Sequence, residues 1–330
     1  MALSKVNPNL ITQGPSGRKN LIINGSMQVA QRGTSLTGLY NNTNYLIDRF
    51  SFGGGATDGR VTMSQDSDGP AGFANSLKLA CTTADTSIAA TEENYFQYRV
   101  EGQDLQQLKK GTSSAEQVTI SFWVKGNASA TAVAEIYDLD NDVHINQLFS
   151  ITTDWVRVEL TYDGDTAARV FNDDNGASLQ FNIWLHSGST FSSGSIQSSW
   201  GSNNGGRAAG ISSFYDSTAR TFSITGVQLE VGSGTDFEHR SYGEELALCQ
   251  RYYWRDSVIT GWYYPIDDSN NTYFRSEVYF PVPMRAAPSV SIIDGSSSGV
   301  QHISTNHCNP TKEYISTYAT WTGITVSAEL

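Results

Sequence analysis

Three aspartates at alternate positions could bind a calcium ion. The run YDLDNDVH places Asp138, Asp140 and Asp142 so that one loop could present three carboxylates to a hard cation. The run is not an EF-hand, because Val143 stands at the position of the glycine and Phe149 at that of the bidentate glutamate. A solvated acidic turn between strands is the simpler interpretation. We therefore expect no cofactor, with calcium at these aspartates as the alternative.

A second candidate site combines aromatic rings with a polar turn. The segment WYYPIDDSNNTYF places aromatic side chains on both flanks of an Asp-Asp-Ser-Asn-Asn turn. Aromatic faces can stack on sugar rings while carboxylates and amides hydrogen-bond sugar hydroxyls. The candidates for contact with a glycan or another receptor are Trp262, Tyr263, Tyr264, Asp267, Asn270 and Tyr273. The alternative is a hairpin that buries about half of these rings.

Other residues of catalytic or metal-binding type lack the spacing for a site. His302, His307 and Cys308 lie in HISTNHC, but no second ligand pair is spaced to complete a tetrahedral zinc site. An ordinary polar strand or loop is the favoured interpretation of this run.

Two pairs of neighbouring acids could in principle flank a glycosidic bond. Asp173 with Asp174, and Asp267 with Asp268, both lie in turn-forming text, and the sequence contains no GxSxG motif. The glycine-rich FGGGATDGR lacks the ending of a phosphate loop. We therefore predict no catalysis.

The composition argues against several kinds of partner. The chain of 330 residues has 21 Lys and Arg against 33 Asp and Glu, a formal net charge of -12, and no basic stripe for nucleic acid. No apolar window of about twenty residues exists, and the start lacks a signal-peptide core, so we expect no membrane insertion. The 3 cysteines are far apart without a CxxC pair, which favours synthesis in a reducing cytoplasm.

Alternating apolar and polar residues predict strands throughout most of the chain. Runs of this period occupy residues 21–29, 118–124, 156–160 and 179–185. Clusters of Asn, Asp and Gly between them predict turns. One-sided strands without crossover helices indicate an all-β fold, an antiparallel jelly-roll β-sandwich. Three tryptophans on the less apolar parity could face a sugar-binding sheet or another subunit: Trp123, Trp155 and Trp184.

Two interruptions of this pattern have specific predictions. In DLQQLKKG, Asp104 can cap a short helical turn, Leu105 and Leu108 lie one turn apart, and Gly111 can end it. Farther on, the apolar parity changes between Ile224 and Val227, which predicts a β-bulge at Gly226 that keeps both halves of one strand facing the core.

The chain changes character again after Gly232 and Gly234. In SYGEELALCQRYYWR, the residues Leu246, Cys249 and Tyr253 fall on one stripe of a two-turn helix. The predicted organisation is an extended anchoring arm at 1–19, the jelly roll at 20–240, a short helical joint at 241–256 and a small β tip at 257–330. A tip of this size is small for independent stability, so a symmetric oligomer is expected to complete its core.

Several phrases together resemble the tail-fibre and tail-associated virion proteins of marine and cyanobacterial bacteriophages. They are NLIINGSMQVAQRGTS, YLIDRFSF, VTISFWVKG, TDWVRVELTYDGD and ITGVQLEVGSGTDFEHRSYGEELALCQRYY, and they span about Asn20 to Tyr253. The order of motifs is also similar, more loosely, to carbohydrate-binding-module jelly rolls.

The resemblance implies a homotrimeric fibre or spike on the virion tail. Residues 1–19 would dock to a tail adaptor or nozzle protein, and the distal part would meet a host-surface glycan or receptor. On this basis we hypothesise that Leu246, Cys249 and Tyr253 pack along the three-fold axis. The alternatives are a tail-spike polysaccharide depolymerase and a decoration or fibre protein attached to the capsid.

Overall fold

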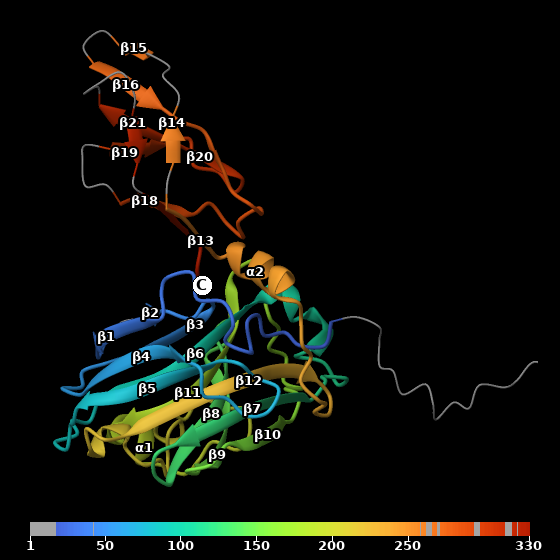
Figure 1. Cartoon of the computed structure of the whole chain (residues 1–330). Coiled ribbons are helices and arrows are strands. Elements are labelled where there is room, and N and C mark those ends of the chain that lie inside the picture. Colours follow the sequence, from blue (N-terminus) through green and yellow to red (C-terminus); the bar gives the residue numbers. More distant parts are fainter. Residues whose placement is uncertain are drawn as a thin grey trace, which may run out of the picture.

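A computed structural model describes residues 18–41, 43–257, 259–261, 266–268, 271–293, 298–313, 319–321 and 323–330. Figure 1 shows a two-layered β-sandwich with a smaller group of strands standing on one end, above helix α2. Among the described residues, no helix is long and apolar enough to cross a membrane.

Two six-stranded antiparallel sheets form the sandwich, as the alternating pattern predicted. In order across the first sheet, the strands are β1 (Ser35–Leu39), β4 (Arg60–Asp66), β5 (Ser76–Thr83), β12 (Thr221–Val231), β7 (Val118–Gly126) and β10 (Val156–Tyr162). Across the second sheet they are β2 (Asn44–Tyr45), β3 (Phe50–Gly55), β6 (Glu93–Glu101), β11 (Ala177–Ser187), β8 (Ala130–Asp138) and β9 (Val143–Ile151). Because most sheet neighbours are not consecutive in the chain, the strands cross between layers in the manner of a jelly roll.

The core lies between these sheets and is made by the predicted apolar faces. In β7, Val118, Ile120, Phe122 and Val124 are all buried. The Phe122 ring lies 5.1 Å from Phe149 of the opposite sheet, centroid to centroid. Full burial of a side chain of this size contributes about 1.5–3 kcal/mol, so the facing rows of large residues are the main force joining the layers.

The bulge predicted at Gly226 is confirmed. The pairing of β12 with β7 shifts register between Thr225 and Gln228, and Gly226 has a φ of +63°. Ile224 before the bulge and Val227 after it are both fully buried. The extra residue therefore lets both halves of β12 face the core.

The strand predicted at residues 21–29 is wrong. This segment forms turns, with Asn24 and Met27 in the left-handed region, while Met27 and Val29 are fully buried. The Asn24 side chain closes the turn, because its Oδ1 accepts the Val29 backbone N–H at 2.9 Å and its amide donates to the Val29 and Asp48 carbonyls. Asparagine tolerates this conformation and supplies the missing backbone partners.

The predicted helical turn at DLQQLKKG is present as two short 3₁₀ helices, η2 (Gly102–Asp104) and η3 (Gln106–Leu108). Leu105 and Leu108 are buried against the sandwich core. Asp104 makes no side-chain cap, and Lys109 takes the left-handed position that ends the turn. The other short helices of the sandwich are α1 (Ser189–Ser192), η4 (Asn204–Gly206) and η5 (Phe214–Asp216).

Helix α2 (Tyr242–Gln250) begins at Ser241, whose hydroxyl accepts the Glu244 N–H. The predicted stripe is only partly correct, since the helix ends at Gln250 and Tyr253 belongs to β13 (Tyr253–Asp256). Cys249 is 0% and Tyr253 is 8% exposed within the single chain. These two side chains are therefore covered by their own subunit and are not a surface for a three-fold contact, whereas Leu246 is only partly buried.

The C-terminal strands form small sheets of their own. One three-stranded sheet contains β13, β22 (Ile324–Ser327) and β18 (Ser289–Ile292). The remaining strands are β14 (Ile259–Gly261), β15 (Ile266–Asp268), β16 (Asn271–Arg275), β17 (Val278–Tyr279), β19 (Ser298–Gln301), β20 (His307–Glu313) and β21 (Ala319–Trp321). A separate cluster that includes Val278, Phe280, Cys308 and Val326 forms the core of this tip.

Ion pairs and hydrogen bonds fasten the tip to the sandwich. Glu101, at the end of β6, accepts bonds from Arg251 and from the Tyr252 hydroxyl. Glu329, near the end of the chain, pairs with Arg49 at 2.7 Å and with Arg32 at 3.0 Å. The chain thus leaves the sandwich through residues 241–256, and its last residues contact the sandwich again. Two separate segments therefore connect the tip to the sandwich.

Candidate functional site

A row of polar side chains crosses the outer face of the second sheet. The strand registers align one residue from each of five strands: Ser51, Gln97, Asn182, Glu135 and Asn146. Each lies on the parity opposite to the core residues, and each is at most 2% exposed. We call this row, with Tyr95, Tyr137, Trp184 and Arg207 beside it, the polar face.

Hydrogen bonds link the row from strand to strand. The Gln97 amide of β6 donates to Asn182 Oδ1 of β11 at 3.5 Å, and Asn182 donates to Glu135 Oε2 of β8 at 2.7 Å. Asn146 donates to Glu135 Oε1 at 3.1 Å. A buried polar group costs stability unless it is paired, so this network lets a hydrophilic row remain under the surface.

An arginine outside the sheet neutralises the acid at the centre of the row. Arg207, which follows η4, donates to both oxygens of Glu135 at 2.8 Å each. Burial would raise the pKa of Glu135, but the Arg207 charge and the hydrogen bonds outweigh it and hold that pKa below its ordinary value. Glu135 is therefore ionised at neutral pH, and this geometry fixes the guanidinium over the sheet.

Aromatic rings surround this guanidinium. Its carbon lies 4.6 Å from the centre of the Tyr137 ring and 5.0 Å from that of Trp184. The Tyr95 ring centre lies 5.1 Å from that of Trp184. Burial raises the pKa of both Tyr95 and Tyr137 to about 12. Both rings are partly exposed, and both hydroxyls stay protonated. The Tyr95 hydroxyl can donate a hydrogen bond, whereas the Tyr137 hydroxyl donates to Asp142 Oδ1 at 2.6 Å and can still accept one.

Two carboxyl groups beside the polar face have opposite pKa shifts, a pattern seen in acid–base pairs. Burial raises the pKa of Glu93, with Arg207 partly opposing, while the pKa of Glu135 is lowered. Each oxygen of Glu135, however, accepts at least two protein hydrogen bonds, from Arg207, Asn146, Asn182 and Trp184. Glu135 is accordingly built to hold Arg207 and has no free oxygen for a nucleophilic role.

The loop after β11 covers one end of the polar face. Trp184 is 0% exposed and packs in a small cluster with Val133 and Ala208, against Phe191 of α1. Trp184 therefore lies on the outer face that its parity predicted, but beneath this loop. The other two tryptophans of that prediction lie elsewhere: Trp123 is in β7, and Trp155 donates to Asp68 beside the first sheet.

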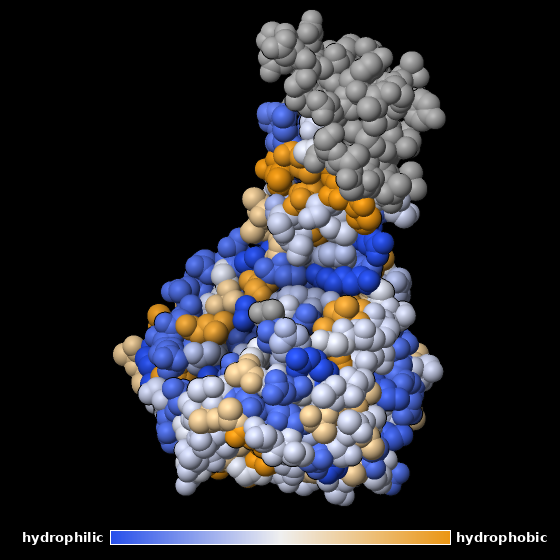
Figure 2. All heavy atoms as spheres, turned by 90° about the vertical axis from the view of Figure 1, so that its left-hand side faces the viewer, coloured by the Kyte–Doolittle hydropathy of each residue, from blue (hydrophilic) through white to orange (hydrophobic). Residues whose placement is uncertain are grey.

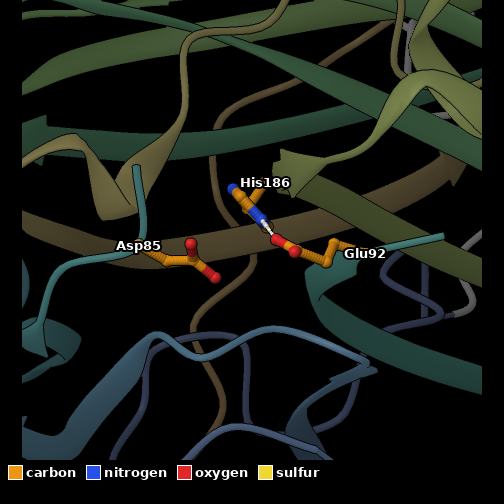
Figure 3. Close-up of side chains that lie close together, drawn as sticks. All are labelled: Asp85, Glu92 and His186. Carbon is orange, nitrogen blue, oxygen red and sulfur yellow. Dashed lines mark hydrogen bonds and ion pairs between the residues drawn. The ribbon is translucent and has the colours of Figure 1, made fainter. Parts of the chain in front are cut away.

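A second cluster lies where the β5–β6 connection passes between the layers. Figure 3 shows Asp85, Glu92 and His186 close together, with the imidazole of His186 directed at Glu92. All three are buried, and one potential ligand atom from each lies within 4.8 Å of the others. Glu92 Oε2 accepts from His186 Nε2 at 2.8 Å, and His186 Nδ1 lies 2.8 Å from Ser213 Oγ.

The donor set of this cluster has the chemistry to hold a metal ion, but protein groups already occupy it. Asp85 accepts bonds from the Thr57 hydroxyl and from the backbone N–H groups of Asp58 and Ser87. These bonds outweigh burial and lower the pKa of Asp85. Together with the Glu92–His186 bond, they account for the arrangement as a network of hydrogen bonds.

The predicted calcium ligands do not converge. Asp138 is buried against the Lys110 ammonium at 2.5 Å, and its Oδ1 accepts the Asp140 and Asn141 N–H groups. Asp140 instead accepts from Asn172, and Asp142 from the Tyr137 hydroxyl. The structure thus does not assemble this site, because Lys110 supplies the positive charge that Asp138 requires.

The predicted glycan contacts fall largely outside the described residues. Trp262, Tyr263, Tyr264 and Asn270 lie there entirely. The backbones of Asp267 and Tyr273 belong to the hairpin of β15 and β16, whose side chains also lie outside the described part. Their role in binding stays a prediction.

The remaining candidates have structural partners. Cys308 is fully buried in the tip core, where burial raises its pKa to about 11. His307 Nδ1 lies 3.0 Å from Ser304 Oγ, and His302 is exposed. Asp174 accepts the Gly176 N–H within a turn, as its sequence context indicated.

Comparison with known proteins adds three distant structural likenesses. No family model matches the chain, and no curated protein matches it. The enzymatically active domain of bacteriophage CBA120 tailspike protein 4 aligns with 64% of this chain and 21% of its own, at 14% identity and a TM-score of 0.34. The chain therefore spans about a fifth of that tailspike's length.

Two carbohydrate-binding modules cover a similar part of the chain. A CBM4 structure aligns with 63% of this chain and 97% of its own, at 15% identity and a TM-score of 0.32. The family 11 module of cellulase Lic26A-Cel5E from Clostridium thermocellum aligns with 61% and 96%, at 12% identity and a TM-score of 0.29. Because these identities and TM-scores are low, only the geometry of the chain itself bears on its function.

Proposed function

We propose that this chain is a structural virion protein, a fibre or spike of a phage tail, that attaches to a host-surface glycan through the polar face. The observation that carries the proposal is the placement of Tyr95, Tyr137 and Arg207 beside a hydrogen-bonded row of buried polar side chains. The virion assignment rests on the sequence resemblance to tail-fibre proteins.

The polar face has the groups that sugar recognition requires. Tyrosine rings provide flat apolar surface for the ring face of a sugar. At the edge of the sugar, the Tyr95 hydroxyl can donate a hydrogen bond and the Tyr137 hydroxyl, which donates to Asp142, can accept one. Arg207, held in place by Glu135 and by two rings, offers a fixed cationic donor, which favours sugars with a carboxylate or other acidic group. A fixed side chain loses little entropy when a ligand binds.

The chain is proposed to bind glycan at this face without cutting its backbone. Both oxygens of Glu135 are occupied, so the pairing with Glu93 that glycosidic cleavage would use is not available to a substrate. Release of short chains from host polysaccharide would overturn this part of the proposal and favour a depolymerase.

The assembly is proposed to be a homotrimer docked to the tail through residues 1–19. Figure 2 shows hydrophobic residues gathered on the described tip just above the sandwich. Ile293 and Ile303, both in the tip, are 45% and 41% exposed, and contact with symmetric neighbours would cover them. Size exclusion with light scattering should give a trimer; a stable monomer would contradict this.

A glycan array tests the binding function directly. The full chain, labelled and applied to an array that includes acidic and neutral glycans, should bind a subset of them. Tyr137→Ala should weaken that binding at least tenfold, which corresponds to about 1.4 kcal/mol. Tyr242→Ala is the matched control, because Tyr242 is 55% exposed on α2 and lies outside the polar face.

The two candidate locations are separated by a second pair of variants. If Trp262→Ala or Tyr273→Ala abolishes glycan binding while Tyr95→Ala and Tyr137→Ala leave it intact, the tip is the binding site and the assignment to the polar face is wrong. No binding of any glycan by the folded trimer would refute the proposed function itself.

A further inference from the structure

The cluster shown in Figure 3 is part of a hydrogen-bonded chain, Ser213–His186–Glu92, that the proposed glycan binding does not use. His186, at the end of β11, bridges two side chains from distant parts of the chain. Its Nε2 lies 2.8 Å from Glu92 Oε2, and its Nδ1 lies 2.8 Å from Ser213 Oγ. A hydroxyl next to an imidazole that a carboxylate orients is the combination of groups found around activated nucleophiles, here with the two ring nitrogens exchanged relative to the Ser-His-Asp triad.

The direction of the protons follows from the hydrogen bonds. Ser213 Oγ accepts the Tyr215 backbone N–H at 3.1 Å, so its own proton is free to point at His186 Nδ1. A Glu92 carboxylate can only accept, which places the imidazole proton on Nε2 and leaves Nδ1 as the acceptor. The network therefore sets His186 to receive the Ser213 proton.

A small cavity adjoins this serine. Its volume is about 20 Å³, where roughly 10–15 Å³ on this scale accommodates one water molecule. Its lining is mostly apolar and includes Ala130, Ile151, Leu185 and Phe222 as well as Ser213. A two-carbon acyl group fits such a space, whereas a fatty acyl chain does not.

One positive group in the cavity wall has no protein partner at one nitrogen. Arg220 lines the cavity, and its Nη1 is buried without a hydrogen-bond partner in the described structure. Its other two guanidinium nitrogens are bound to Asp216, which fixes the side chain. A buried, unpaired donor of this kind is costly and needs an explanation; an oxyanion formed at Ser213 would supply the missing acceptor.

We infer that Ser213, His186 and Glu92 form an ester-hydrolysing site for small acyl groups such as acetyl. The Ser213 Oγ bonds to the carbonyl carbon while its proton passes to His186 Nδ1, and Arg220 stabilises the oxyanion. The ester C–O bond then breaks as His186 returns the proton to the departing alcohol. Water attacks the acetyl-serine by the same route, which releases acetic acid and restores the Ser213 hydroxyl.

This site is distinct from the polar face and stands independently of glycan binding. A catalytic site here would depart from the sequence-based expectation of no catalysis. Its three residues lie far apart in the chain, with 94 positions between Glu92 and His186 and 27 between His186 and Ser213. Neither separation resembles a local motif, so the sequence alone could not reveal it.

Labelling of the wild-type chain provides the first test. Incubation of the full protein with methanesulfonyl fluoride, whose methylsulfonyl group is close to acetyl in size, followed by peptide mass spectrometry, should find the label on Ser213 and on no other serine. Because this experiment needs no variant, it does not depend on whether a substitution disturbs folding. Absence of label on Ser213 after prolonged incubation would overturn the inference.

Hydrolysis of p-nitrophenyl esters provides the second test. The wild-type chain should release p-nitrophenol from the acetate ester at least tenfold faster than from the octanoate, because the cavity admits only a short acyl group. Ser213→Ala should reduce hydrolysis about a hundredfold or more, while Ser189→Ala, on exposed α1, should leave it unchanged. Equal rates for wild type and Ser213→Ala would refute the inference.

Glu92 acts through His186 and is a positioning residue. Glu92→Gln should lower kcat for p-nitrophenyl acetate by about tenfold or more with KM within about twofold, since the acyl cavity is untouched. A purely structural role would instead lower the melting temperature and leave kcat of the folded fraction unchanged, which would count against the inference.

Discussion

Replacing Arg207 with methionine tests whether the ion pair under the polar face holds that face together. Glu135 is 0% exposed and the Arg207 side chain is 13% exposed. Methionine keeps an unbranched apolar stem but removes the guanidinium, and with it both hydrogen bonds and the charge that compensates Glu135. Removing one partner of a buried pair costs about 3–5 kcal/mol, because the remaining charge stays buried. We therefore expect the free energy of unfolding at pH 7.5 to fall by about this amount.

The destabilisation of this variant should depend on pH, whereas an ordinary loss of packing would not. In the wild type, the lowered pKa of Glu135 contributes stability that is present above the unfolded value of about 4.3 and lost as the pH falls through the folded pKa. Without Arg207, burial raises that pKa, so protonation near pH 5 relieves the penalty. The difference between variant and wild type should thus shrink from pH 7.5 to pH 5.

Urea unfolding followed by circular dichroism measures both effects. The matched control is Arg157→Met, since Arg157 pairs with Glu159 at the surface, with side chains 32% and 41% exposed. Exposed pairs contribute about 0–1 kcal/mol, so this variant should differ little from wild type at either pH. A loss below about 1 kcal/mol for Arg207→Met, or a loss independent of pH, would refute the reasoning about Glu135.

Three further changes have defined outcomes. Gly226→Ala should lower the free energy of unfolding by about 1–3 kcal/mol, since its φ is +63° and an added Cβ would lie 2.7 Å from the Phe73 ring. The control Gly243→Ala, in open space on α2, should not destabilise the protein. Equal melting temperatures for the two variants would contradict the strain at Gly226. Leu246→Asp should reduce trimer assembly, measured by light scattering, more than sandwich folding, and an unchanged trimer would place this side chain within one subunit. Burial raises the pKa of Asp48 to about 7, so the wild type should lose about 1 kcal/mol of stability as the pH rises from 6 to 8. Asp48→Asn should abolish this loss; the same loss in that variant would assign it to another group.

Much of the sandwich could be predicted from the sequence because its strands have a strict period of two. Val118 to Val124 show an apolar face that any antiparallel layer must bury, and the parity change at Gly226 has few physical solutions other than a bulge. The error at residues 21–29 has a local cause. The apolar parity of residues 21–29 predicts a strand, but Asn24 and Gly25 form a turn within it.

The polar face could be predicted only in part. In β11, Asn182 and Trp184 alternate with buried apolar residues in the sequence, which already indicates that one side of this strand is not part of the apolar core. Their partners, however, come from strands that are neighbours in space and distant in the chain. Arg207 lies in a loop without a regular sequence pattern. Its pairing with Glu135 could therefore not be predicted from the sequence.

The three aspartates of the alternative calcium site have separate partners for a related reason. The spacing of Asp138, Asp140 and Asp142 is compatible with one cation, but the spacing says nothing about competing partners. Lys110 lies 28 positions before Asp138 in the chain. The two meet because Leu108 of η3, two residues before Lys110, packs in the sandwich core. Such long-range pairing is set by topology and not by local sequence.

Titration calorimetry of the full chain with the glycan selected on the array is the most direct test of attachment through the polar face. The wild type and the Tyr242→Ala control should give the same heat and affinity, and the Tyr95→Ala, Tyr137→Ala double variant, with an unchanged melting temperature, should show binding weakened by at least tenfold. Unchanged affinity in the folded double variant would show that the glycan binds elsewhere and would contradict the account.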